Sequence, residues 1–386
     1  MATVRKRHTA SGDTRWDVRY WDPQRRQRTR TFQRKIDADK FANLVETDIA
    51  RGEWLDPDLA KETFGDWASR WLLTTRGRAP KTRERYESTL RRHLLPRFET
   101  TPVSRITHPA VLALLADLDS SGSSLHTARN VRAVLRLVLE LARRSGAIRV
   151  NPVDGATLPM PPPTEMVFLT ADQIATLASE VANRHSAGNG RAGTIHPDYG
   201  LLVRFAGFTG LRAGEIVALR TAAIDTMRGR VHVLASATEA YGRIHVGPPK
   251  TKQRRSVPIP KSLVDELAQH LAAKGESDFV FTSAQGEMLR YSNFYRRHFK
   301  PAVSRAGLPE ATRFHDLRHS FAALLIAEGA HPKAIMEWLG HSSIQVTLGT
   351  YGHLFPNLEA SLVDALDEVY RSAQLIEVAT VSSIER

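Results

Sequence analysis

One stretch near the end of the chain, residues 315–353, limits the fold more than any other. Apolar residues recur at near-helical spacing over 315–327, which predicts a buried helix. Gly329 then interrupts the pattern, and a second short helix is expected over 332–340. Gly340 is a typical C-terminal stop for such a helix. Two helices separated by so short a break must pack close together.

The polar residues of this stretch suit an oxygen nucleophile that attacks phosphorus. On a helix, His315 and Arg318 share one face because they are three positions apart. Guanidinium and imidazole groups stabilise the negative charge that builds on phosphoryl oxygens. A tyrosine can form a covalent intermediate with phosphorus. We therefore interpret His315, Arg318, His341 and Tyr351 as candidate catalytic residues.

Two motifs further upstream complete an ordered set. The first, Thr-Gly-Leu-Arg-Ala-Gly-Glu at 209–215, contains Arg212, and the second, at 249–259, places Lys250 in or beside a turn between expected strands. They are followed by His-x-x-Arg-His at 315–319, by Leu-Gly-His ending at His341, and by Tyr351. With all of these landmarks in this order, the chain resembles the tyrosine recombinase (phage integrase) family.

The resemblance implies a role for each residue of the set. Tyr351 is the expected nucleophile, and His315 is its nearest expected base or hydrogen-bond partner. Arg212 and Arg318 are the expected phosphate clamp, although an ordinary ion pair between Arg212 and Glu215 remains the alternative. His341 is a further phosphate donor, and Lys250 protonates the departing 5′ oxygen. The supporting residues, expected to orient these groups rather than react, are Glu215, Asp316 and His319.

The implied reaction is site-specific recombination. The tyrosine attacks a DNA phosphodiester, forms a 3′-phosphotyrosyl link and releases a 5′ hydroxyl, and a 5′ hydroxyl of a partner strand reverses the step. The covalent link conserves the bond energy, so no ATP, metal or other cofactor is expected. The implied partners are double-stranded DNA attachment sites and a homotetramer on DNA. The resemblance implies integration of a mobile element, and it leaves open excision and the participation of accessory DNA-bending or directionality proteins.

The composition agrees with a nucleic-acid partner. Lys plus Arg minus Asp plus Glu is 54 − 41 = +13, and the sequence pI is about 10.2, which favours a polyanion. The absence of cysteine excludes disulfides, thiol nucleophiles and Cys-based zinc sites. We find no signal peptide and no apolar run long enough to span a membrane. We therefore expect a DNA-associated protein of the bacterial cytoplasm.

The chain pattern predicts an α+β multidomain protein. Residues 1–58 alternate as strands and then shift to helical spacing, which resembles an N-terminal arm-site DNA-binding domain. Residues 61–150 are helical throughout and resemble a core-binding domain, and the proline-rich segment 151–163 is an expected linker. Residues 164–386 form the expected catalytic domain, mainly helical with a small antiparallel sheet.

Two surface features carry further hypotheses. Arg129, Arg132 and Arg136 line one side of the helix expected over 124–145, and such a stripe is a candidate phosphate track. Ordinary surface charge is the alternative, and the resemblance favours DNA. Beyond Tyr351, the leucines and Val369 of 358–369 predict an amphipathic helix. It packs either on its own domain or on a neighbouring protomer.

Three rival functions remain open. A zinc hydrolase is one, because His315 and His319 are spaced as in H-E-x-x-H, although Asp316 replaces the glutamate and Arg318 puts a cation beside the metal. A DNA-binding regulator without catalysis is the second. The third, a type IB topoisomerase, uses the same tyrosine attack to relax DNA.

Overall fold

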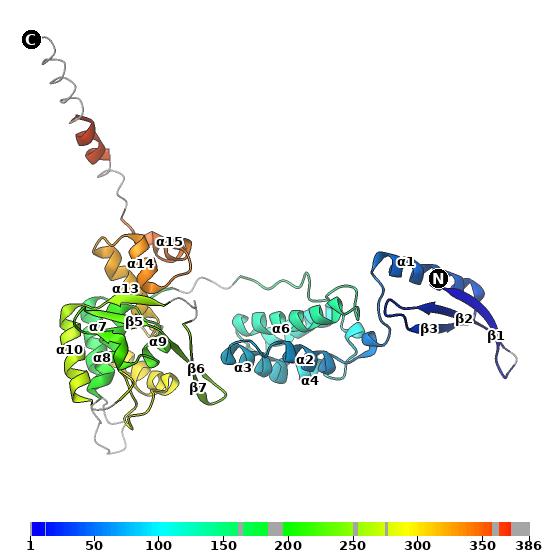
Figure 1. Ribbon diagram of the computed structural model, residues 1–386, viewed down its shortest axis with the longest axis horizontal. Coiled ribbons are helices and arrows are strands. Elements are labelled where there is room, and N and C mark those ends of the chain that lie inside the picture. Colours follow the sequence, from blue (N-terminus) through cyan, green and yellow to red (C-terminus); the bar gives the residue numbers. More distant parts are fainter. Residues whose placement is uncertain are drawn as a thin grey trace, which may run out of the picture. The chain divides into compact units, whose positions relative to one another are not determined.

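The computed structural model describes most of the chain, namely residues 2–11, 13–160, 165–183, 196–249, 254–274, 277–356 and 363–371. The chain divides into two compact units, residues 1–163 and 164–386. The mixture of helices with small antiparallel sheets confirms the predicted fold class (Figure 1). The finer division of the first unit into an N-terminal domain and a helical domain stays a prediction.

The first unit begins with a small sheet covered by one helix. Strands β1 (Thr3–His8), β2 (Thr14–Trp21) and β3 (Gln27–Phe32) pair antiparallel in that order, and α1 (Lys35–Arg51) packs on one face. The alternation predicted for β2 is present, since Val18 is buried and Arg19 is exposed. The sequence did not reveal β1, because its mostly charged residues conceal the two-residue period.

Helices make up the rest of the first unit. Its elements are η1 (Leu59–Lys61), α2 (Phe64–Thr74), α3 (Pro80–Thr89), η2 (Leu90–Leu94), α4 (Leu95–Phe98), η3 (Val103–Arg105), α5 (His108–Ser120) and α6 (Leu125–Arg144). Thr63 caps α2: its hydroxyl accepts from the backbone N–H of Asp66, whose carboxylate accepts from the backbone N–H of Thr63. The buried side chains of these helices form one hydrophobic core.

Pro96 does not end the helix in which it lies, although a proline inside a helix usually breaks it. The chain stays helical through α3, the π-helical turn η2 and α4, and it reaches Phe98. Within η2 the N–H of Leu95 donates to the carbonyl of Leu90, a wider spacing than in an α-helix. This shift in the hydrogen-bond register directly precedes Pro96, which has no N–H to donate, and so the proline is accommodated.

The second unit carries helices around two small antiparallel sheets, ordered β4-β5-β8 and β6-β7. Its strands are β4 (Ile224–Asp225), β5 (Arg230–Val233), β6 (Ser236–Ala240), β7 (Arg243–Gly247) and β8 (Arg255–Pro258). Its helices are α7 (Ala171–Ala182), α8 (Pro197–Thr209), α9 (Ala213–Val217), η4 (Thr221–Ala223), α10 (Lys261–Ala273), α11 (Tyr291–Phe294), η5 (Tyr295–Phe299), α12 (Lys300–Arg305), α13 (Asp316–Ala327), α14 (Pro332–Leu339), α15 (Ile344–Tyr351) and η6 (Gly352–Leu354).

The packing of α13 brings distant segments together. This helix lies against α8 on one side and α14 on another, and α15 continues from α14 (Figure 1). Helices α8 and α14 both end in a left-handed glycine, Gly210 at φ 62° and Gly340 at φ 65°. A Cβ on Gly210 would lie 2.4 Å from the ring of Phe321 on α13, so only glycine permits this close approach.

The segment beyond Tyr351 is described in part. Residues 363–371 are helical, and Leu366 and Val369 are exposed there. Leu358 and Leu362 of the predicted amphipathic helix lie outside the described residues. Whether this helix packs on its own domain or on another protomer stays open.

Candidate active site

Arg212 stands at the N-terminal end of α9, directly after the reversal that Gly210 permits. Its backbone N–H donates to Glu215 Oε2 at 2.8 Å, and its Nη1 donates to Glu215 Oε1 at 3.0 Å. The ion pair considered as an alternative therefore exists. However, Nη2 also reaches the carbonyl of Gly340 at 3.3 Å, which connects this arginine to the end of α14.

Arg318 lies on α13 and is 3% exposed. Its Nη1 donates to the carbonyl of Gly210 at 2.7 Å, and its Nη2 donates to the carbonyl of Leu339. Because Leu339 and Gly340 are consecutive, Arg318 and Arg212 converge on the same end of α14. Burial and the charges of Arg212 and Arg255 lower the pKa of Arg318 to about 9, so the group remains protonated at neutral pH.

A third arginine, Arg255 on β8, completes this cationic cluster. Its guanidinium donates to both oxygens of Glu215, at 2.9 and 2.7 Å, and to the carbonyl of Trp338 at 2.8 Å. Burial alone would raise the pKa of Glu215, but the hydrogen bonds and charge of Arg255, together with Arg212, lower it. One buried carboxylate thus holds two arginines in place.

The sequence contained a signal for Arg255 that our prediction did not use. Arg255 and Val257 are two positions apart on β8, and Val257 is fully buried. Side chains two apart on a strand point to the same face. An arginine at such an inward position requires a buried acceptor.

Tyr351 ends α15 and is 1% exposed. Its hydroxyl lies 2.8 Å from Nδ1 of His319 on α13. Burial raises the pKa of the tyrosine, and the nearby charge of Arg318 partly opposes this rise. The nucleophile candidate therefore shares one location with the arginines, although the segments that supply them are far apart in the sequence.

The prediction that His315 is the nearest partner of Tyr351 is wrong in this structure. The ring of His315 contacts the ring of His319 edge-on, with centroids 4.9 Å apart, and His319 makes the hydrogen bond to the tyrosine. Both histidines lie on one helix face with Arg318, so spacing alone did not distinguish them. Partial desolvation and the neighbouring cations lower the pKa of His315 to about 4.

His341 follows Gly340 directly, and the left-handed glycine turns it toward α15. Its Nδ1 lies 2.9 Å from the hydroxyl of Thr347, and its ring is nearly parallel to that of Tyr351, with centroids 6.3 Å apart. Burial, together with Arg318 and Arg212, lowers its pKa to about 4. The ring is therefore neutral at neutral pH and can donate one hydrogen bond to a phosphate oxygen.

Lys250 lies outside the described residues. Strand β7 ends at Gly247 and β8 begins at Arg255, so this lysine belongs to the connection between them, where the sequence places it. Its role as proton donor stays a prediction.

The arginines of the candidate phosphate track contact the segment that follows α6. These contacts fasten residues 154–159 to the helix. Arg129 Nη2 donates to the carbonyl of Pro159 at 2.7 Å, Arg132 to the carbonyl of Ala156, and Arg136 to the carboxylate of Asp154 at 3.0 Å.

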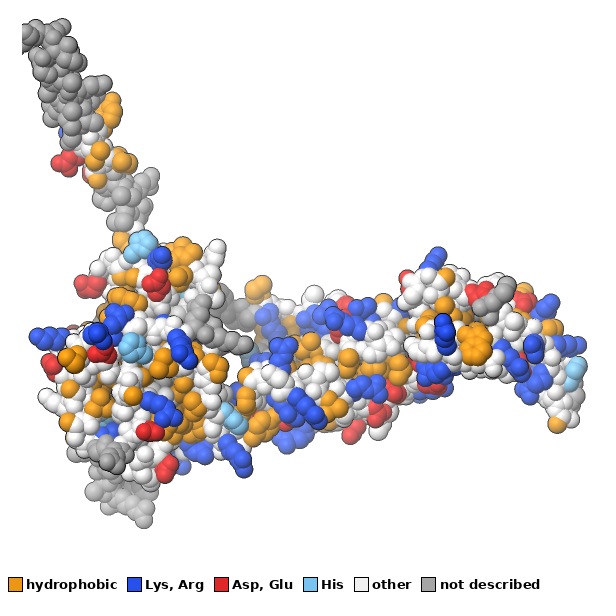
Figure 2. Space-filling model, viewed as in Figure 1, with side chains coloured by type: hydrophobic (Ala, Val, Ile, Leu, Met, Phe, Trp, Pro, Cys, Tyr) orange, Lys and Arg blue, Asp and Glu red, His pale blue; other side chains and the backbone are white. Residues whose placement is uncertain are grey.

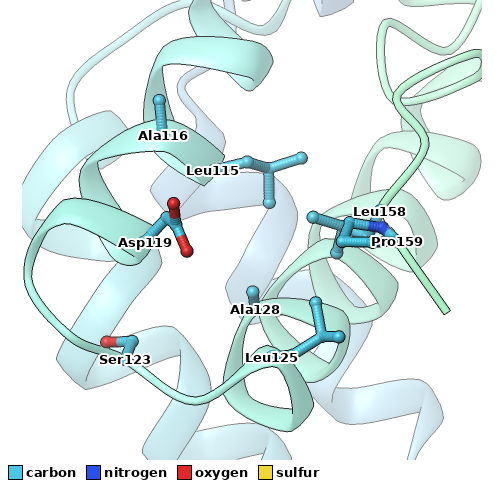
Figure 3. A pocket seen from close by; sticks show the side chains of 8 residues that line it. All are labelled: Leu115, Ala116, Asp119, Ser123, Leu125, Ala128, Leu158 and Pro159. Carbon is cyan, nitrogen blue, oxygen red and sulfur yellow. The ribbon is translucent and has the colours of Figure 1, made fainter. Parts of the chain in front are cut away.

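The same segment lines one side of a partly open, mostly apolar pocket of about 240 Å³. Leu158 and Pro159 face Leu115 on α5 and Leu125 on α6 across this pocket (Figure 3). The contacts of the three arginines and these apolar contacts hold the beginning of the linker against the helices. The DNA contacts predicted for the arginines remain untested.

Among the described residues, no three His, Asp or Glu side chains are grouped closely enough to hold a metal ion. No helix within them combines the length and apolar character that crossing a membrane requires.

The family comparisons cover most of the chain. The sequence model of the phage integrase family matches residues 167–357, and that of the phage integrase central domain matches residues 64–157. The prophage phiRv2 integrase of Mycobacterium tuberculosis is 27% identical over an alignment of 376 residues that covers 94% of each chain.

The solved structures agree in fold. The Tn1549 transposon integrase in complex with transposon right end DNA aligns with a TM-score of 0.65 at 20% identity, covering 78% of this chain and 98% of that one. A lambda integrase tetramer bound to a Holliday junction aligns with a TM-score of 0.57 at 20% identity, covering 88% and 95%.

Proposed function

The chain belongs to the tyrosine recombinase (phage integrase) family and is a site-specific DNA recombinase, and on this premise we propose that Tyr351 is its nucleophile. In this proposal the enzyme cuts and rejoins DNA through a 3′-phosphotyrosyl intermediate and thereby integrates a mobile element. The single observation that carries the proposal is the shared location of the Tyr351 hydroxyl, His319 and the buried guanidinium of Arg318.

The proposed cleavage step uses the arginines as the phosphate clamp. Arg318 and Arg212 now donate to carbonyls of Gly210, Leu339 and Gly340. A DNA phosphate entering the cluster offers anionic oxygens, which accept stronger hydrogen bonds than carbonyls do. Because the clamp is already assembled, its donors meet the charge of the transition state without a large reorganisation.

His341 and Lys250 complete the proposed reaction. The neutral ring of His341 donates to a nonbridging oxygen, and Lys250 gives a proton to the 5′ oxygen as the P–O5′ bond breaks. When the 5′ hydroxyl of another strand attacks the phosphotyrosine, that hydroxyl returns its proton to Lys250. All cations in this scheme are side chains, so the proposal includes no metal or other cofactor.

We extend the proposal to the DNA partner. Integrases with this fold are bound to DNA in the solved structures, one of them as a tetramer on a Holliday junction. By analogy, we propose that four copies of this chain act on double-stranded attachment sites in a bacterial cell. Each chain contains a single set of candidate catalytic residues and can therefore cut one strand at a time, so several copies are needed to exchange the strands of two duplexes. Accessory DNA-bending or directionality proteins would be additional partners.

The open face of the N-terminal sheet supports a second DNA contact in the same proposal. Residues directly opposite each other share a face of an antiparallel sheet. Arg5 pairs with Asp17, Arg7 with Arg15, and Thr3 with Arg19, opposite the face that α1 covers. Figure 2 shows Lys and Arg side chains over this part of the molecule. A narrow basic sheet of this kind fits the major groove.

The test is Tyr351→Phe, assayed on nicked duplexes built from the DNA that borders the gene. We expect the variant to bind these duplexes with wild-type affinity and to form no covalent adduct on a denaturing gel. Wild-type protein that binds but forms no adduct would favour a DNA-binding regulator. Adducts followed by relaxation of any supercoiled plasmid, without exchange between two defined duplexes, would favour a topoisomerase.

A further inference from the structure

We propose that His319 accepts the proton of Tyr351 during DNA cleavage, an inference that rests on the function proposed above. His319 is the residue whose ring nitrogen lies at hydrogen-bond distance, 2.8 Å, from the tyrosine hydroxyl. A general base must reach the proton that it abstracts, and geometry is the first criterion for it. His319 meets that criterion.

The two neighbouring histidines are engaged differently. His341 is nearly parallel to the ring of Tyr351, and its Nδ1 lies beside the hydroxyl of Thr347. His315 contacts His319 edge-on and lies on the preceding turn of the same face. Within the described part of the chain, neither imidazole makes a hydrogen bond to Tyr351. The geometry therefore assigns the tyrosine proton to His319 and leaves His315 and His341 to bind the phosphate.

The surroundings keep His319 neutral and able to accept. The neighbours of His319 on or just before α13 are Arg313, His315, Asp316 and Arg318. Two further neighbours, His341 and Tyr351, face His319 from the ends of α14 and α15. Helix α8 also packs on α13, but its charged residues pair with α10 instead of His319. Asp198 pairs with His270, and Arg204 pairs with Glu266. Burial, aided by Arg318 and Arg313 and opposed by Asp316, lowers the pKa of His319.

The proton balance closes over one cycle. In cleavage, the O–H bond of Tyr351 breaks, the proton moves to Nδ1 of His319, and the phenolate oxygen bonds to phosphorus. The P–O5′ bond breaks, and the 5′ oxygen takes a proton from Lys250. In rejoining, a 5′ hydroxyl attacks and returns its proton to Lys250, while the departing phenolate recovers its proton from His319. No oxidant, reductant or further reactant enters.

The experiment compares His319→Asn, His319→Gln and His315→Asn on the nicked duplexes, with the adduct rate measured from pH 5 to 9. The asparagine side chain places an acceptor near the position of Nδ1 but cannot take the proton. The glutamine side chain places its amide near the position of Nε2 instead. We expect His319→Asn to cleave about 10²-fold more slowly at pH 7, and His319→Gln to be slower still.

The pH profile separates proton transfer from positioning. The wild-type rate should level off above pH 6.5, because neutral His319 is the active form and its pKa is lowered. The rate of His319→Asn should instead rise by about tenfold per pH unit across the alkaline range, since the raised pKa of Tyr351 then governs deprotonation. His315→Asn should be slower but keep the wild-type shape.

Three results would overturn the inference. A wild-type rate for His319→Asn would reduce His319 to a positioning role, and an alkaline rise in His315→Asn alone would assign the proton to His315.

Loss of folding is monitored by DNA affinity, which should stay within about threefold of wild type. If wild-type protein itself forms no adduct, the proposed function fails with the inference; if it does, only the inference is at risk.

Discussion

Arginines serve different purposes in the two units of this chain. In the second unit, Arg318 is almost fully buried and donates to carbonyls, and within the described residues it has no carboxylate partner. In the first unit, Arg136 is half-exposed and paired with Asp154. Both arginines were predicted to bind phosphate because of their sequence setting. The structure separates them by burial and by the balance of neighbouring charges.

The difference in burial and pairing between Arg318 and Arg136 indicates which arginines have positive charge that an anion can neutralise. Burying a guanidinium costs free energy unless a partner compensates it. Arg212 and Arg255 share the carboxylate of Glu215, and Arg318, which donates to carbonyls instead, is a third cation in the same cluster. The cluster therefore carries an excess of positive charge in a desolvated place. A half-exposed arginine that is already paired with a carboxylate, such as Arg136, contributes no comparable excess of positive charge.

The largest expected effect comes from Arg318→Lys. Lysine keeps the charge but loses the planar fork that holds two acceptors at once. We expect the adduct rate to fall by about 10³-fold or more, as for other arginines that stabilise phosphoryl transfer. The matched control is Arg313→Lys, whose half-exposed side chain pairs with the buried carboxylate of Asp316. Equal losses in both variants would break the distinction between buried and exposed arginines.

Arg255→Met should mainly reduce stability. It leaves the buried Glu215 with Arg212 as its remaining ion-pair partner among the described residues, and breaking a buried pair costs about 3 kcal/mol or more. The free energy of unfolding of the second unit, measured in urea, should fall accordingly. The double variant with Glu215→Gln should recover part of the loss. Arg254→Met, which alters the exposed neighbour, is the control, and an equal loss there would contradict the role of Arg255.

The local features of this fold were readable from the sequence. Thr63 and Thr170 each cap a helix together with the residue three positions later, a spacing that the sequence displays because capping depends on neighbours along the chain. Gly340 ends α14 for the same reason. The candidate catalytic residues could be proposed from the sequence because their motifs are local and ordered.

The unpredicted features depend on three-dimensional packing. Whether Tyr351 meets His315 or His319 is decided by how α15 docks on α13, and spacing within α13 cannot determine that. The pairing of Arg255 with Glu215 joins β8 to α9 across 40 positions. Strand β1 pairs along the edge of β2, whereas its mostly charged sequence alone did not indicate a strand.

A smaller effect is expected from the triple variant Arg129→Ala, Arg132→Ala and Arg136→Ala. Each of the three guanidinium groups uses one N–H donor to hold residues 154–159. Each group has further N–H donors, and we propose that these donors contact DNA phosphates. The slope of log affinity against log salt should then fall in magnitude by about 2 to 3. The control changes Arg143 and Arg144, which both pair with Glu140, to alanine. An unchanged slope in the triple variant would limit the three arginines to fastening the linker.

The smallest expected effect is that of a chelator. If the excess charge of the Arg212, Arg255 and Arg318 cluster supplies the electrostatic stabilisation, excess EDTA should change the adduct rate by less than about twofold. His315 and His319 are spaced like zinc ligands, but Nδ1 of His319 is directed to the hydroxyl of Tyr351. A loss of activity in EDTA that zinc or magnesium restores would mean that a metal ion shares the task of the arginines, and the contrast between the two units would then no longer rest on arginine burial alone.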